Sequence, residues 1–143
     1  MTFLNSGFSQ HIQINDTTYI YVDEDTVTKE KKLPTTIGKK IDVGFVGLFE
    51  KDLVKVVHNR RSVFSGTIST VDENGEWVYP KSKFILTVKK QNNLRLIVND
   101  FELTFPLRKG YRLLYIYSDR DKIDRRDVTV YTFRYTNEYI KTL

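Results

Sequence analysis

The chain of 143 residues contains no cysteine and no alanine, and it has only two histidines and one tryptophan. The missing cysteines exclude disulfides, thiolate nucleophiles and cysteine-ligated zinc or iron–sulfur centres. Disulfides are typical of small secreted domains, so their absence favours a cytoplasmic protein. Alanine is the strongest helix former, whereas the abundant tyrosine, phenylalanine, valine, isoleucine and threonine favour strands. The composition therefore predicts β structure.

Long apolar runs are missing as well. No segment approaches the roughly 18–20 consecutive apolar residues that span a bilayer, and the first residues lack the pattern of a signal peptide. We therefore expect a cytoplasmic chain, and a membrane anchor elsewhere in a longer parent protein stays open. The length fits one domain over 1–143, with N-terminal strands and a polar loop (1–40), a sandwich core (41–135) and a tail (136–143).

Neither sign of charge is in large excess. The chain has 23 lysines and arginines against 18 acidic residues, a formal net charge of +5, and the two signs are interspersed. A basic balance is compatible with nucleic acid, anionic lipid or an acidic protein partner. Because mixed surface charge also keeps ordinary domains soluble, this small excess favours none of these partners by itself.

Short segments of alternating apolar and polar residues run through the chain, which is the pattern of half-buried strands. In the segment FELTFPL, for example, Phe101, Leu103 and Phe105 alternate with polar residues. Pro106 indicates that this strand ends there or lies at a sheet edge, since proline cannot donate to a β-ladder. The sequence predicts an all-β fold, an antiparallel β-sandwich with about seven to ten strands and little or no helix.

Polar residues between these segments predict the turns. Asn15-Asp16 and the segments 59–61 and 91–93 are expected to join hairpins. The charged segment 119–127 is expected to form a loop between the last two strands. The segment 72–75 is expected to let one strand return along the next, because Asn-Gly tolerates positive φ.

The segment from 70 to 88 carries a resemblance to a known family. It runs from a threonine through acidic residues, Asn-Gly, an aromatic residue and a proline turn into an alternating strand: Thr70, Asp72, Asn74, Gly75, Trp77, Pro80, Phe84, Leu86 and Val88. This order resembles the core of the transthyretin-like, or carboxypeptidase-regulatory-like, β-sandwich family, an Ig-like architecture. Val71 separates Thr70 from Asp72, which more often adjoin in the family, and the first 40 residues have no counterpart.

The resemblance implies a seven-stranded sandwich core that serves as a non-enzymatic accessory or docking module within a larger protein. Transthyretin-like hydrolases use paired histidines and a C-terminal tetrapeptide, whereas this chain offers only His11 and His58 and ends in YIKTL. The chain is also similar to cytoplasmic transthyretin-like domains in membrane-complex subunits of the type VI secretion system of Bacteroidetes. Its composition suits an AT-rich genome of that kind.

Three acidic groups are candidate metal or acid–base sites. Asp72, Glu73 and Glu76 lie in the Asn-Gly turn, and turn geometry accounts for them without chemistry. The segments 23–26 and 119–127 lack the glycine of a calcium loop, and the bases of the second segment balance its acids. Two histidines are too few for a histidine-ligated metal, and no nucleophile or phosphate-binding motif is present. We therefore expect no enzyme activity, catalytic residue, metal or cofactor; an enzyme acting on a small ligand would need a pocket that the sequence does not reveal.

The basic residues and the aromatic residues suggest an alternative. Basic clusters lie at 29–32, 39–40, 60–61 and 125–126. Several aromatic residues could stack on bases in an oligonucleotide-binding barrel: Trp77, Tyr79, Tyr111, Tyr115 and Tyr117. Alternation places such aromatics equally well inside a sandwich, and outward lysines discourage aggregation of sheet edges. Nucleic acid is therefore the alternative partner and not the favoured one.

We favour a non-enzymatic interaction module, one domain of a larger assembly, that docks a protein partner through a sheet edge or end loops. Partly exposed aromatic residues anchor interfaces, and arginines join them. The candidate contact residues are Trp77, Tyr79, Arg60, Arg61, Arg125 and Arg126. Trp77 is equally suited to the core.

Overall fold

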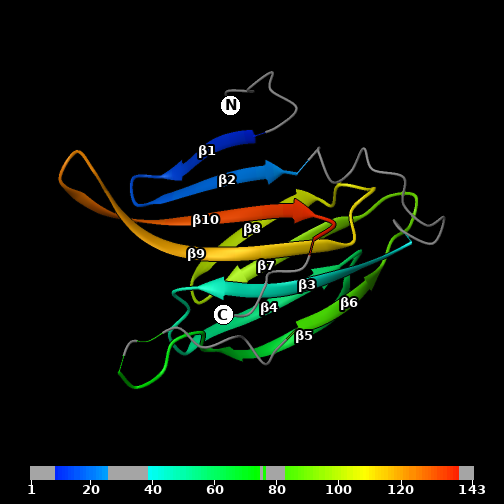
Figure 1. Ribbon diagram of the computed structural model, residues 1–143, viewed down its shortest axis with the longest axis horizontal. Coiled ribbons are helices and arrows are strands. Elements are labelled where there is room, and N and C mark those ends of the chain that lie inside the picture. Colours follow the sequence, from blue (N-terminus) through cyan, green and yellow to red (C-terminus); the bar gives the residue numbers. More distant parts are fainter. Residues whose placement is uncertain (1–8, 26–38, 75, 77–82, 139–143) are drawn as a thin grey trace.

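Ten strands and no helix make up the part of the chain that the structure describes (Figure 1). The computed structural model describes residues 9–25, 39–74, 76 and 83–138. The strands are β1 (Ser9–Asn15), β2 (Thr18–Glu24), β3 (Lys40–Gly47), β4 (Asp52–His58), β5 (Arg61–Ile68), β6 (Lys83–Thr87), β7 (Asn93–Val98), β8 (Phe101–Pro106), β9 (Leu113–Ile123) and β10 (Arg126–Thr136). β-branched and aromatic residues alternate with polar ones in most of them, as half-buried strands require.

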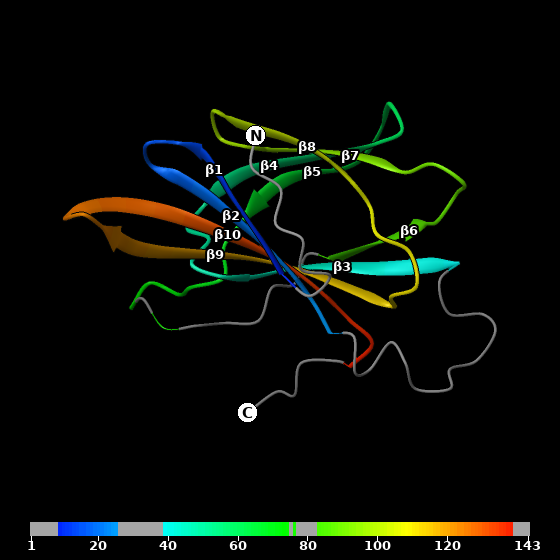
Figure 2. The same ribbon diagram turned by 90° about the horizontal axis from the view of Figure 1, so that it is seen from above.

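The strands form two sheets that pack face to face (Figure 2). One has six strands in the order β1-β2-β10-β9-β3-β6, and the other has four in the order β5-β4-β7-β8. The prediction of an all-β sandwich is thus confirmed. Most pairings between described strands are antiparallel, but β2 pairs with β10, and β3 with β9, in parallel. Parallel neighbours need a long connection, and residues 25–125 lie between β2 and β10 while residues 48–112 lie between β3 and β9.

Two segments predicted as hairpin turns instead connect strands of different sheets. The chain passes from β5 in the four-stranded sheet to β6 in the six-stranded sheet, and then back to β7. The prediction that the bend at 72–75 returns one strand along the next is therefore wrong, as is the hairpin predicted at 91–93. Alternation with a period of two indicates which face of a strand is buried, but it does not identify the strand that pairs with it.

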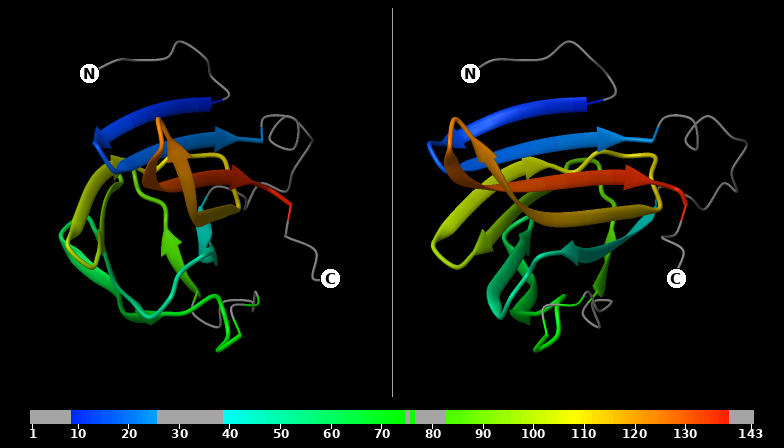
Figure 3. Two further views of the ribbon diagram at one scale, coloured as in Figure 1. Left: turned by 90° about the vertical axis from the view of Figure 1, so that its left-hand side faces the viewer. Right: turned by 60° about the vertical axis from the view of Figure 1, so that its left-hand side comes forward.

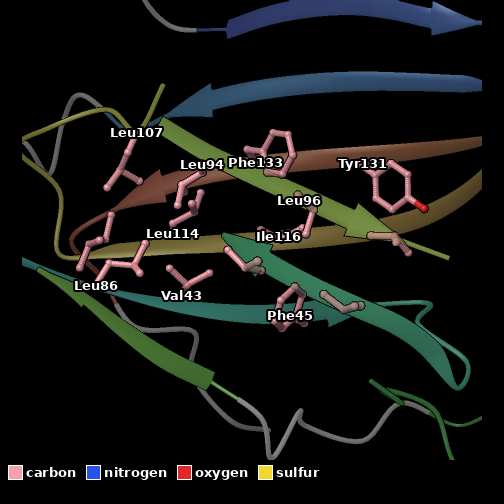
Figure 4. Packing of buried hydrophobic residues seen from close by; sticks show 14 of the residues in the cluster. Val43, Phe45, Leu86, Leu94, Leu96, Leu107, Leu114, Ile116, Tyr131 and Phe133 are labelled. Carbon is pink, nitrogen blue, oxygen red and sulfur yellow. The ribbon is translucent and has the colours of Figure 1, made fainter. Parts of the chain in front are cut away.

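The core lies between the two sheets and is built from alternate residues of both (Figure 4). Leu94 of the four-stranded sheet and Ile116 of the six-stranded sheet belong to the same cluster and are at most 2% exposed. Aromatic rings add contacts across the gap, since Phe105 stacks on Phe133 with ring centroids 4.6 Å apart. Each fully buried side chain of this kind contributes about 1.5–3 kcal/mol, which holds the sheets together.

The last two strands are longer than predicted. β9 and β10 stay paired up to their turn, so the charged segment 119–127 is mostly a two-stranded ribbon and not the predicted loop (Figure 1). Asp124 and Arg125 alone form the turn, with φ of 52° and 67°, which are the left-handed values of a two-residue hairpin. Ile123 and Val128 pack in a small second apolar cluster. These apolar contacts explain why a segment so rich in charge stays extended.

Candidate functional site

Four strands lie at sheet edges, and they differ in what lies beside them. β5 and β6, edges of different sheets, meet at one corner, where the rings of Phe64 and Phe84 stack with centroids 5.5 Å apart. β1 and β8 are the edges on the other side, where β1 and β2 extend past the four-stranded sheet (Figure 1 and Figure 3). Among the strands that the structure describes, β8 has β7 as its single neighbour in the sheet. With respect to the described strands, β8 is thus an open edge.

The hydrogen-bond register fixes which backbone groups of β8 face β7. Just beyond the end of the strand, the amide nitrogen of Leu107 donates to the carbonyl oxygen of Asn92 across 2.9 Å. In an antiparallel pair, every second residue exchanges hydrogen bonds with the neighbouring strand. Counting back from Leu107, the residues of β8 that are bonded to β7 are therefore Phe105, Leu103 and Phe101.

The residues between them direct their backbone groups outward. The N–H and C=O groups of Glu102 and Thr104 point to the open edge, and both residues are exposed. Pro106 occupies the next such position, where its missing N–H removes no ladder hydrogen bond. The prediction that Pro106 ends a strand or marks an edge is confirmed on both counts.

The inward side chains of β8 are only partly covered. Phe101, Leu103 and Phe105 are each partly exposed, whereas the inward leucines of neighbouring β7 are 1% exposed. Stacking on the opposite sheet accounts for the covered part, because the ring centroids of Phe101 and Tyr131 lie 5.5 Å apart. β8 therefore combines outward backbone groups with apolar surface that a further strand would cover, and edges of this kind attract extended segments.

A shallow depression lies on the solvent face of the four-stranded sheet, beside the same edge. It is open to solvent, has a volume of about 490 Å³ and is lined by Val57, Asn59, Arg60, Asn93, Leu94, Arg95 and Thr104. Val57, Arg95 and Thr104 are register partners on the adjacent strands β4, β7 and β8. They form one row across the sheet, and the row ends at the open edge.

Asn59 fixes the turn that forms one wall of the depression. Its backbone N–H donates to the carbonyl oxygen of Asn93 at 3.0 Å, and its side-chain oxygen accepts from the amide of Asn93 at 2.8 Å. Its side-chain nitrogen donates to the carbonyl oxygen of Gln91 at 2.9 Å. Asn59 and Arg60 have φ of 47° and 71°, the values of a two-residue hairpin turn. The backbone of Arg60 is thereby held at the end of the sheet.

Two arginines give the depression its charge. Arg60 is exposed, and Nε of Arg95 lies 2.9 Å from Oε1 of Glu102, with the two side chains 48% and 54% exposed. An ion pair as exposed as this one contributes at most about 1 kcal/mol, so Glu102 is an exchangeable partner for Arg95. The lining residues can bind an anionic group, but they do not pair a nucleophile with a base. The depression is therefore suited to binding.

The structure separates the arginines that the sequence proposed as contacts. Arg60 lines the depression, and Arg61 follows it as the first, exposed residue of β5. Arg125 and Arg126 lie at the β9–β10 turn, at the opposite end of the molecule from the β4–β5 turn (Figure 1 and Figure 2). Arg126 approaches Asp16 at 3.9 Å there. The two arginine pairs therefore do not form one site.

The predicted aromatic contacts Trp77 and Tyr79 lie outside the described residues. Sequence reasoning missed Arg95 and Thr104. The position of Pro106 in an alternating strand was the available signal for the edge and hence for Thr104. Arg95 lies beside the β4–β5 turn only because β7 pairs with β4, and no local pattern in the sequence identifies that pairing.

The acidic segment at 72–76 forms a bend, although not the predicted hairpin between paired strands, and the side chain of Asp72 has a structural role in it. The Oδ1 atom of Asp72 accepts hydrogen bonds from the backbone amides of Asn74 and Glu76, each at 2.8 Å. The amide of Asp72 in turn donates to the carbonyl oxygen of Glu76 at 2.8 Å. Asp72 thus holds its own loop, in the manner typical of aspartate in turns.

His58, the last residue of β4 before a hairpin turn, is buried. It is 7% exposed, and its Nε2 lies 3.0 Å from Oδ1 of Asn92. Since an amide oxygen only accepts, Nε2–H of His58 is the donor. Oδ1 of Asn92 also accepts from the amide of Lys89 at 2.8 Å, and its Nδ2 donates to the Lys89 carbonyl at 2.7 Å. Within the described ranges, no three histidine, aspartate or glutamate side chains gather as metal ligands.

Three of the tyrosines considered for base stacking, Tyr111, Tyr115 and Tyr117, lie on different sides of the six-stranded sheet. Tyr111 is a core residue, 1% exposed, whose hydroxyl donates to Oε1 of Glu24 at 3.0 Å; burial and then this hydrogen bond raise the pKa of Tyr111. Tyr115 and Tyr117 are partly exposed on the other face, with centroids 6.5 Å apart. Burial also raises the pKa of Tyr117, and Arg134 opposes this shift. The three rings do not form one continuous stacking row.

The β8 edge and the depression beside it form the candidate site. Together they bring outward backbone groups, partly covered apolar side chains and two arginines to one stretch of surface.

The residues described include no helix that is long and apolar enough to cross a membrane. No protein-family model, curated protein or solved structure matches the chain.

Proposed function

We propose that this protein is a non-enzymatic interaction module that binds an extended segment of a protein partner along the β8 edge. The observation that carries the proposal is found on one strand. Glu102 and Thr104 direct their backbone groups outward, while Phe101, Leu103 and Phe105 are only partly covered. A partner strand paired with β8 would form hydrogen bonds with these backbone groups and would cover the exposed parts of these apolar side chains.

Strand addition to an open edge is a general mode of peptide recognition. Main-chain hydrogen bonds supply the affinity, and alternate side chains supply the specificity. Because β1 and β2 of the six-stranded sheet extend past the four-stranded sheet (Figure 3), a strand added to β8 would lie opposite the six-stranded sheet and not in open solvent. The apolar surface that it covers would add about 25 cal/mol per Å².

The same role fits a transthyretin-like domain within a larger assembly, and we propose that family for the chain. The two-sheet architecture supports it, as does the order of Thr70, Asp72, Asn74 and Gly75 before β6. In its narrower form, the chain is a cytoplasmic domain of a membrane-complex subunit of the type VI secretion system. Purification through a tagged chain tests this form. Recovery of other membrane-complex subunits supports it, and a chain purified without them overturns it.

A photoactivatable cross-linking residue in place of Glu102 tests strand addition in cells. Capture of a defined protein should be lost when Thr104→Pro is added, because proline removes an outward N–H that β7 does not use. Thr104→Ala keeps that N–H and should keep the capture. The same probe at Lys55, an exposed residue in the central strand β4, is the position control.

Capture at position 102 that depends on the Thr104 N–H, with none at position 55, supports the proposal. Equal capture by the proline and alanine variants contradicts it, provided that their unfolding free energies agree to about 1 kcal/mol, as expected for an edge substitution. If no protein is captured and a labelled oligonucleotide binds with strong salt dependence, the oligonucleotide-binding alternative replaces it.

A further inference from the structure

We infer that the partner segment is acidic, and that a strand paired with β8 places a carboxylate side chain in the depression lined by Arg60 and Arg95. The inference rests on the proposed strand addition at β8 and specifies the chemistry of the partner. It follows from the register of the sheet and from the charge around the depression.

The row formed by Val57, Arg95 and Thr104 indicates where the partner's side chain would enter. Neighbouring strands lie about 4.8 Å apart, so a residue paired opposite Thr104 would have its backbone about 10 Å from that of Arg95. An arginine and a glutamate side chain together span this distance. Thr104 lies between them and is small and exposed, so it leaves the path across the sheet open.

Both arginines are available to a partner's carboxylate. Arg60 is exposed at its turn. Arg95 is engaged by Glu102 at 2.9 Å, but both side chains are about half exposed, and such pairs are weak. The backbone groups of Glu102 point to the open edge, and its side chain contacts Arg95. A strand paired with this edge would bring its own carboxylate side chain close to the same guanidinium group. One carboxylate can therefore replace the other at small cost.

The charge of the depression favours an acidic segment over a basic or apolar one. Its lining includes two arginines and no carboxylate among the residues that the structure describes, and the whole chain carries a formal net charge of +5. A lysine or arginine opposite Thr104 would face like charge, which suppresses binding of wrong partners. An apolar side chain would cover the guanidinium groups without accepting hydrogen bonds from their N–H groups.

A random peptide library displayed on phage, selected against the folded chain, tests the inference. The selected peptides should alternate β-branched or aromatic residues with polar ones and should carry aspartate or glutamate at one recurring position. Synthesised peptides should bind the Arg60→Gly variant about tenfold more weakly, as expected for the loss of one charge-assisted hydrogen bond. Glu102→Gln should tighten the same peptides about threefold, because it removes a weak competing carboxylate.

Arg125→Gly is the matched control for Arg60→Gly. Both arginines are the second residue of a two-residue hairpin turn, with φ of 67° and 71°, so glycine relieves the same left-handed conformation in each. Neither variant should unfold, and only Arg60→Gly should weaken the peptides. Equal affinity for both variants would show that the Arg60 side chain has no part in binding.

Three further outcomes separate the inference from the proposed function. Peptides that lose binding to Thr104→Pro, yet lack an acidic position and bind Arg60→Gly normally, overturn the inference and leave strand addition standing. Peptides whose binding is unaffected by Thr104→Pro overturn strand addition, and the inference fails with it. A selection that yields no binding peptide counts against strand addition in the same way.

Discussion

Asn92 illustrates how single polar residues hold this fold together. It lies where the chain leaves the six-stranded sheet for the four-stranded one, and its amide serves three partners. These are Nε2–H of His58 and both backbone groups of Lys89, all within 3.0 Å. Since Asn92 and His58 are both buried, water does not readily replace these hydrogen bonds.

We expect Asn92→Ala to lower the free energy of unfolding by about 2–3 kcal/mol, because it leaves a buried imidazole N–H and a backbone carbonyl without their partner. Urea denaturation followed by circular dichroism measures the change. Gln91→Ala, at an exposed neighbouring position, should stay within about 0.5 kcal/mol of the unchanged chain. If both variants lose the same stability, the Asn92 network does not have the assigned role.

At the scale of elements, two hairpin turns share an unusual feature. The β4–β5 and β9–β10 turns both place arginine in a left-handed conformation, at φ of 71° for Arg60 and 67° for Arg125. Glycine is the residue that adopts this conformation without steric penalty. The arginine side chains are therefore kept at some cost to stability.

Arg60→Gly and Arg125→Gly should each stabilise the fold by about 0.5–1 kcal/mol, the gain from relieving the left-handed residue less the greater chain entropy of glycine. Thermal unfolding should show a higher midpoint for each single variant and additive gains in the double variant, because the turns lie at opposite ends of the molecule. A lower midpoint for either variant would contradict the strain assigned to that turn.

The elements also show what the sequence can and cannot predict. β8 was predictable in detail, because Phe101, Leu103 and Phe105 repeat with the period of a strand and Pro106 marks its edge. The β9–β10 ribbon was not predictable, since its strands continue through charged residues and only a few apolar contacts stabilise them. The partners of β6 and β7 were not predictable either, because turn residues mark a change of direction and not the sheet that the chain enters. The site depends on such pairings, so only its edge was foreseeable.

At the scale of the whole molecule, buried tyrosines link the fold to pH. Burial raises the pKa of Tyr135 to about 12, with the backbone N–H and charge of Arg108 opposing the shift. Burial also raises the pKa values of Tyr111, Tyr117 and Tyr131. An unfolded tyrosine titrates near 10. Because the folded state holds these protons more tightly, the stability that they provide is complete below about pH 10 and is lost as the pH rises toward the folded pKa values.

We therefore expect the free energy of unfolding to be flat up to about pH 10 and to fall steeply from there to about pH 12. Tyr135→Phe keeps the ring beside Tyr111, where the centroids are 5.4 Å apart, and should make this decline shallower. Denaturant titrations at a series of pH values measure both effects. A stability that does not change across this alkaline range would show that the tyrosine hydroxyls are not held as described.

The whole molecule also explains why an edge is open. A six-stranded sheet packs on a four-stranded one, and the corner between β5 and β6 is closed by stacked rings. Because the two sheets differ in their number of strands, the six-stranded sheet extends beyond the four-stranded one on the other side, where β8 is the last described strand of its sheet. An open edge is a liability for aggregation unless it is short or used; here it is short, and Pro106 ends it.

Amide hydrogen exchange of the free chain, resolved by NMR, tests the open β8 edge most directly. The amides of Leu103 and Phe105, which donate to β7, should be protected, whereas those of Glu102 and Thr104 should exchange near the unprotected rate. This alternation would establish outward N–H groups ready for a partner strand. Uniform protection along β8 would show that the edge is already occupied, and uniform fast exchange would show that β8 is not paired with β7; either result would contradict the account.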